Sequence, residues 1–160
     1  MAWLRTAASP AAPTSPGSVL LASEGRPLSP AAIEAARRLA SAAGVPVHVL
    51  SIARVWGTSL GLPNPALLPS KREWDEQRRQ VESAITALRR SGVTARGRVV
   101  GTRQATRRIL AEAAALGCSA IVMAADRARH WLIADMLWSQ EPYRVRRRSP
   151  IPVHLVTAAD

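Results

Sequence analysis

The sequence predicts a single three-layer α/β/α domain built on a five-stranded parallel sheet. Five short apolar runs, bounded by glycine, proline and small polar residues, alternate with segments whose apolar residues recur at helical spacing. The connections between the runs are long enough for helical crossovers, which favours parallel strands covered on both faces. At 160 residues and 48% hydrophobic composition, the chain can bury one core but is too short for two typical domains.

The five apolar runs are expected to be strands. The second is dense in aliphatic and β-branched residues, as in a central strand buried on both faces. The third alternates with polar residues, and the fifth contains a proline, which fits only a strand start or a sheet edge. The expected strands are residues 18–23, 47–55, 93–101, 119–125 and 151–156.

Capping residues mark the helices between these runs. Ser29 followed by Pro30, and later Ser70, are favourable helix starts, and Gly44 and Gly117 are favourable ends. The expected helices are residues 28–43, 71–91 and 104–116, and a last helical region within 127–149 that includes 131–138. The stripes expected to face the sheet are Ile33, Ala36, Leu39, Ala40 and Ala43 in the first helix, and Trp74, Val81, Ile85 and Leu88 in the second.

The segment before the first strand differs in composition from the rest. Residues 1–17 are rich in alanine, proline, serine and threonine and show no hydrophobic periodicity, which predicts a disordered tail. They also lack the continuous apolar stretch of a secretory signal, and no run in the chain is long enough to span a membrane. We therefore expect a cytoplasmic protein whose domain occupies residues 18–160.

The charge is strongly positive and unevenly distributed. The formal net charge is +11, and residues 96–148 hold eleven arginines against four acids. The stretch Tyr143–Arg148 (YRVRRR) combines clustered arginines with an aromatic residue, a pattern suited to nucleic acid or another acidic partner. Arginines in the last turn of a helix also stabilise its dipole while facing solvent, so both interpretations stay open. The residues concerned are Arg144, Arg146, Arg147 and Arg148.

The sequence shows no pattern of residues typical of an enzyme active site or of a metal site. Cys118 is the only cysteine, has no metal-ligand spacing around it and is expected to be buried. His48 and His154 fall inside expected strands, and only His130 lies in a loop suited to acid–base chemistry. Since no nucleophile elbow or glycine-rich phosphate loop is present, we expect no catalysis, although slow ATP hydrolysis stays open.

A parallel sheet of this kind binds ligands beyond the carboxyl ends of its strands. The segments to consider are Ser23–Gly25, Ala53–Arg54, Gly101–Arg103 and Ala124–Arg127.

These strand ends carry a resemblance to the universal stress protein family. VLLASEGRPLS at 19–29 is similar to the opening signature of that family, AIVMAADR at 120–127 resembles its fourth strand, and WSQEPYRVRRRSPIPVHLV at 138–156 resembles its last helix and strand. The resemblance implies a Rossmann-like sheet of order 3-2-1-4-5 and a homodimer formed through the last strand, at Pro152, Val153, His154, Leu155 and Val156.

Family members that bind ATP carry a Gly-x2-Gly-x9-Gly-Ser/Thr loop, because glycines let backbone amides approach phosphates closely. Here the glycine positions fall on Ala124, Arg127 and, approximately, Trp138, with Ser139 in the serine position. The loop is therefore degenerate, and we expect no cofactor.

If ATP or another adenine nucleotide does bind, the resemblance places adenine near Ile52 and Ala53, ribose near Glu24 and phosphates near Arg127 and Ser139. The whole candidate site is Glu24, Ile52, Ala53, Ala124, Asp126, Arg127 and Ser139. The resemblance thus favours a dimeric, non-enzymatic stress-response protein that acts through an unidentified protein partner. A nucleotide-binding sensor with an altered loop and a basic module for nucleic acid or another acidic surface are the alternatives.

Overall fold

The computed structural model describes residues 17–54, 68–126 and 140–157. Within them the strands are β1 (Val19–Ser23), β2 (Val47–Arg54), β3 (Ala95–Thr102), β4 (Ala120–Ala125) and β5 (Val153–Thr157). The helices are α1 (Pro30–Ala43), α2 (Lys71–Arg90), α3 (Ala105–Ala115) and α5 (Glu141–Arg148). The predicted tail (1–17, apart from Gly17), the expected helical region 131–138, and Arg127, His130 and Ser139 lie outside the described residues.

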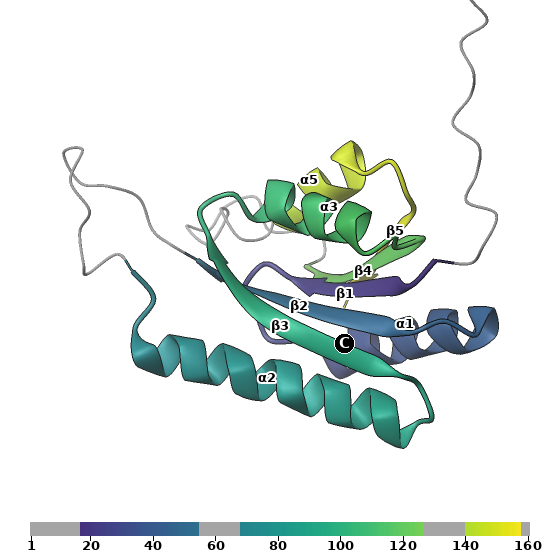
Figure 1. The fold of residues 1–160 in the computed structure, drawn as a ribbon. Helices are drawn as coiled ribbons and strands as arrows, with labels where there is room; N and C mark the ends of the chain where they lie inside the picture. The colour runs from purple at the N-terminus through teal and green to yellow at the C-terminus, as the bar shows by residue number, and fades with distance from the viewer. Residues whose placement is uncertain (1–16, 55–67, 127–139, 158–160) are drawn as a thin grey trace, which may run out of the picture.

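All five strands run parallel in the order β3-β2-β1-β4-β5, which confirms the predicted fold class and strand order. α1 and α2 cover one face, and α3 and α5 cover the other (Figure 1). β3 and β5 are the two edge strands, as their polar alternation and proline predicted. The carboxyl ends of β1, β2 and β4 consequently meet at one edge of the sheet.

Each face of the sheet has its own apolar core. One core joins α1 and α2 to residues such as Leu21, Val49 and Val122, and the other joins α3 and α5 to residues such as Leu20, Ile52 and Met123. Alternate residues of the central strands enter opposite cores, because side chains of a strand point to its two faces in turn. This explains why the central strands are continuously apolar.

The helix caps follow the sequence closely. The Ser29 hydroxyl accepts from the Ala32 N–H, and Ser70 forms a reciprocal capping box with Glu73. Gly44 ends α1 in the left-handed conformation, at φ 67°, where glycine has no steric penalty. These caps fix where α1 and α2 begin and hence how they approach the strand ends.

The predicted stripes are partly wrong. In α1 the fully buried residues are Ala32, Ala36 and Ala40, while Ala43 is exposed. Ala43 lies in the last turn, beyond the surface of the sheet, so helical spacing alone did not bury it. In α2, Val81 and Leu88 are buried and Ile85 packs against the same core, as predicted, whereas Trp74 is half-buried.

Candidate functional site

The carboxyl ends of β1, β2 and β4 are joined by an ion-paired network. Glu24 follows β1 directly and is completely buried, and its Oε1 accepts from the Arg26 Nε. The same guanidinium reaches the exposed Asp126 after β4, with 3.1 Å between Nη1 and Oδ1. Arg54, at the end of β2, donates from its Nε to the Glu24 carbonyl oxygen at 3.1 Å. We call Glu24, Arg26, Arg54 and Asp126 the strand-end network.

Helices on both faces extend this network. From α2, the Gln77 Nε2 donates to the Gly25 carbonyl at 3.0 Å, while its Oε1 accepts from the Ser51 hydroxyl. From α5, the Tyr143 hydroxyl donates to the Asp126 carbonyl at 2.8 Å. The loop after β1 is thereby held to β2, β4 and α2.

Burial of the Glu24 carboxylate is energetically costly. Desolvation raises its pKa above the usual 4.5, and the positive charge of Arg26 opposes that rise. Its Oε2 has no hydrogen-bond partner among the described residues. An ionised carboxylate in this setting depends on Arg26, because a buried charge without a partner costs several kcal/mol.

A second buried acid lies at the start of α5. The Glu141 Oε2 accepts from the Thr106 hydroxyl, and its Oε1 accepts from the Arg144 Nη1 at 3.1 Å. Burial lowers the pKa of Arg54. The negative charge of Glu141, and to a smaller extent that of Glu24, opposes this decrease, so both acids act on this arginine. The first turn of α5 thus already holds a carboxylate, and Pro142 in the same turn has no N–H to offer a phosphate.

A cavity of about 170 Å³ opens beside the network, lined by Gly25, Ile52, Ala53, Arg54, Pro69, Glu73 and Gln77. It brings together the two residues predicted to contact adenine, Ile52 and Ala53. Its volume is below the roughly 300–1,000 Å³ of typical small-molecule sites. Glu24, which pairs with Arg26, is not among its lining residues.

The other predicted site residues divide into three groups. Asp126 joins the network through Arg26, as its position after β4 suggested. Ala124 is half-buried and packs against the core beneath α1 and α2. Arg127 and Ser139 lie outside the described residues, so the predicted phosphate contacts stay predictions.

The sequence did not single out Arg26 or Gln77, and it indicated Arg54 only as the end of the strand-end segment Ala53–Arg54, without a role. Gln77 was detectable, because it lies on the same helical stripe as Trp74 and Val81, where a polar residue needs a buried partner. Arg26 and Arg54 gave a weaker signal, as arginines next to strand ends near an acid.

The described histidines do not reach this edge. His48 lies near the amino end of β2. Desolvation is the main cause that lowers its pKa, and the positive charge of Arg96 lowers the pKa further. The Arg96 Nε donates to the His48 Nδ1 at 3.1 Å, which fixes a neutral ring. His154 is exposed on β5. Cys118 is buried as predicted, and burial raises its pKa.

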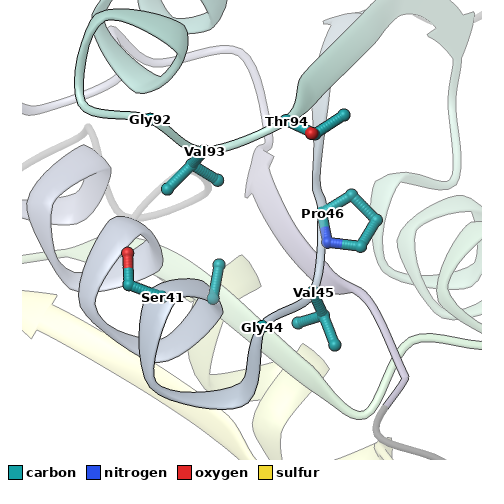
Figure 2. A pocket seen from close by; sticks show the side chains of 8 residues that line it. Ser41, Gly44, Val45, Pro46, Gly92, Val93 and Thr94 are labelled. Carbon is teal, nitrogen blue, oxygen red and sulfur yellow. The ribbon is translucent and has the colours of Figure 1, made fainter.

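Another hollow, of about 440 Å³, lies at the other end of the strands, beside the amino ends of β2 and β3 (Figure 2). Its lining comes from the end of α1 and the turns before β2 and β3, and includes Ser41, Val45, Pro46, Val93 and Thr94. These residues offer hydroxyls and backbone but no charged side chain. Among the described residues, no group of three or more histidines, cysteines and acids could hold a metal ion, and no helix is long and apolar enough to cross a bilayer.

The five-stranded parallel sheet with helices on both faces is a doubly wound α/β fold. Proteins of this class bind ligands at the carboxyl ends of their strands, where the strand-end network lies. The sequence profile of the universal stress protein family matches residues 17–157. The chain therefore belongs to the universal stress protein family, which supports a role in the stress response.

Solved structures show the same fold. A universal stress protein family member from Burkholderia pseudomallei is 23% identical, with a TM-score of 0.62 over 88% of this chain and 96% of that one. The universal stress protein from Archaeoglobus fulgidus in complex with dAMP is 17% identical, with a TM-score of 0.62 and the same coverages. A universal stress protein in complex with cAMP is 15% identical, with a TM-score of 0.60 over 91% of this chain and all of the other. No curated protein sequence matches the chain.

The raised pKa of Glu24 predicts a specific pH dependence. The folded state holds this proton at pH values where the unfolded chain has released it, so the residue makes the fold less stable as pH rises above 4.5. Glu24→Gln removes this proton equilibrium. The free energy of unfolding, measured by urea denaturation from pH 4.5 into the neutral range, should therefore fall in the wild type relative to the variant.

Glu76→Gln is the matched control. Glu76 is exposed, and its hydrogen bond from Arg79 lowers its pKa. Its contribution to the free energy of unfolding is therefore fully present above pH 4.5, and the effect of Glu76→Gln on that free energy should not change with pH in this range. If the difference in free energy of unfolding between the wild type and Glu24→Gln also stayed constant over this pH range, the result would contradict a raised pKa of Glu24.

Proposed function

We propose that this chain is a cytoplasmic, non-enzymatic stress-response protein that acts as a homodimer through protein partners and does not bind ATP in the manner of nucleotide-binding relatives. The observation that carries the proposal is the pairing of the buried Glu24 with Arg26. In this state the carboxylate that the resemblance places near the ribose is already paired with a cation and buried.

The charge at the strand ends supports the same proposal. Three acids, Glu24, Asp126 and Glu141, are matched by three arginines, Arg26, Arg54 and Arg144. A triphosphate brought here would have to displace internal ion pairs rather than occupy a positive pocket. The first turn of α5, where a helix N-terminus would attract an anion, holds Glu141 instead.

The alternative is an adenine-nucleotide sensor with an altered loop. It is favoured by the cavity at Ile52 and Ala53 and by the dAMP and cAMP complexes of the structural neighbours. In that case Arg26 would have to leave Glu24 when the ligand binds.

Thermal unfolding with millimolar Mg-ATP, ADP, AMP or cyclic AMP distinguishes these two functions. A ligand at about 100 times its Kd would stabilise the native state by about 2.7 kcal/mol, and at this chain length that raises Tm by several degrees. We expect no shift beyond that of a magnesium chloride and sodium tripolyphosphate control of equal ionic strength, because this control reproduces any binding of the phosphate groups alone. A selective rise with any of the four nucleotides would establish the sensor function instead.

The homodimer is proposed through β5. Among the described strands this edge strand pairs with β4 alone, and its apolar residues Val153, Leu155 and Val156 are half-buried. An exposed edge of this kind presents free backbone donors and acceptors to another chain. A two-fold pairing of β5 with its copy would satisfy them.

His154→Lys should weaken this dimer. His154 is the second residue of β5 and is exposed, and a two-fold pairing of the edge centred near this residue would bring two lysines close together. Sedimentation velocity should show a dimer for the wild type and a shift toward monomer for the variant. Ser83→Lys adds a charge on the exposed surface of α2 and should leave the dimer intact. A wild-type monomer, or an unaffected His154→Lys dimer, would contradict the β5 interface.

A further inference from the structure

A second groove, of about 460 Å³, runs between the start of α3 and α5. Both helices lie on the same face of the sheet (Figure 1). The groove shares no lining residue with the cavity at the strand ends. It is therefore a separate hollow, although Glu141 and Arg144, which the proposed function counts among the charges at the strand ends, also line it.

Four arginines line this groove, two from each side. Arg103 and Arg107 lie before and in the first turn of α3, and Arg144 and Arg148 lie one turn apart on α5. The single acid in the lining is Glu141, which is buried and already accepts from Thr106 and Arg144. The groove consequently carries a clear excess of positive charge.

Much of this charge has no internal counterion. Arg103 and Arg148 form no ion pair with any described residue, and the Arg107 Nη1 makes only a long 3.5 Å contact with the Gln104 Oε1. The amino end of α3, which carries a partial positive charge, opens here without a side-chain cap from Gln104. Like charges brought together in this way repel one another, and a bound anion would relieve the repulsion.

The lining also indicates the chemistry of the anion. A guanidinium pairs with phosphate through two parallel hydrogen bonds, so two pairs of arginines can hold two phosphate groups. The volume lies within the range of small-molecule sites, and Leu110 and Ala105 add an apolar wall. None of the described lining residues is aromatic, so nucleic-acid bases would have no side chain to stack on. We propose that the α3–α5 groove binds a small molecule carrying two or more phosphate groups.

Isothermal titration calorimetry with sodium tripolyphosphate tests the proposal on the full chain. The wild type should bind the probe, and the Arg103→Ala/Arg148→Ala double variant should bind at least about tenfold more weakly, because charge-assisted hydrogen bonds are lost. Both arginines lack described ion pairs, so their removal should leave Tm nearly unchanged. Arg146→Ala/Arg147→Ala is the matched control, since it removes the same charge from exposed residues of α5 that do not line the groove. Its affinity should stay within about twofold of the wild type.

Three results would overturn the proposal. The first is a wild type that does not bind tripolyphosphate at low millimolar concentration. The second is an equal loss in the two double variants, which would indicate diffuse attraction to the basic surface. The third is tighter binding of a single-stranded oligo-dT probe that depends on Arg146 and Arg147, which would assign this face to nucleic acid.

Discussion

The burial of one carboxylate, that of Glu24, governs the arrangement of polar side chains at the carboxyl ends of the strands, where folds of this class bind ligands. A glutamate with no exposed surface at the end of β1 needs a cation within reach, and Arg26 supplies it from two residues further along. Arg26 also reaches Asp126, so the same guanidinium joins the ends of β1 and β4. Arg54 and Gln77 hold the intervening loop to β2 and α2. The edge where this fold class binds ligands is thus occupied by the protein's own polar side chains.

The fold was predictable from the sequence because its signals are local. Buried parallel strands are continuously apolar, and Ser29, Ser70 and Gly44 mark helix ends through contacts within a few residues. The strand-end network was much less predictable. Whether Glu24 faces a ligand or Arg26 depends on side-chain directions at three strands, which composition and spacing do not encode. Ala43 shows the same limit, since its spacing fits the stripe but the helix has passed the sheet there.

Charge is arranged differently on the two faces of the sheet. On α2, exposed arginines pair with acids at helical spacing, as Arg79 does with Glu76. On α3 and α5 the arginines outnumber the acids, and Glu112 and Glu141 are buried and already paired. Part of the positive charge of α3 and α5 therefore lines the groove between them. A family fold whose usual edge is internally satisfied can bind ligands elsewhere on its surface.

The central claim is that Arg26 keeps Glu24 from a ligand. Calorimetric titration with adenosine tests it most directly, because adenosine has no phosphate and depends only on the adenine and ribose positions. We expect weak or no binding to the wild type and tighter binding to Arg26→Ala, in which the Glu24 side chain is no longer held by Arg26 and can form a hydrogen bond with a ribose hydroxyl. Equal or tighter binding of adenosine to the wild type would contradict this claim.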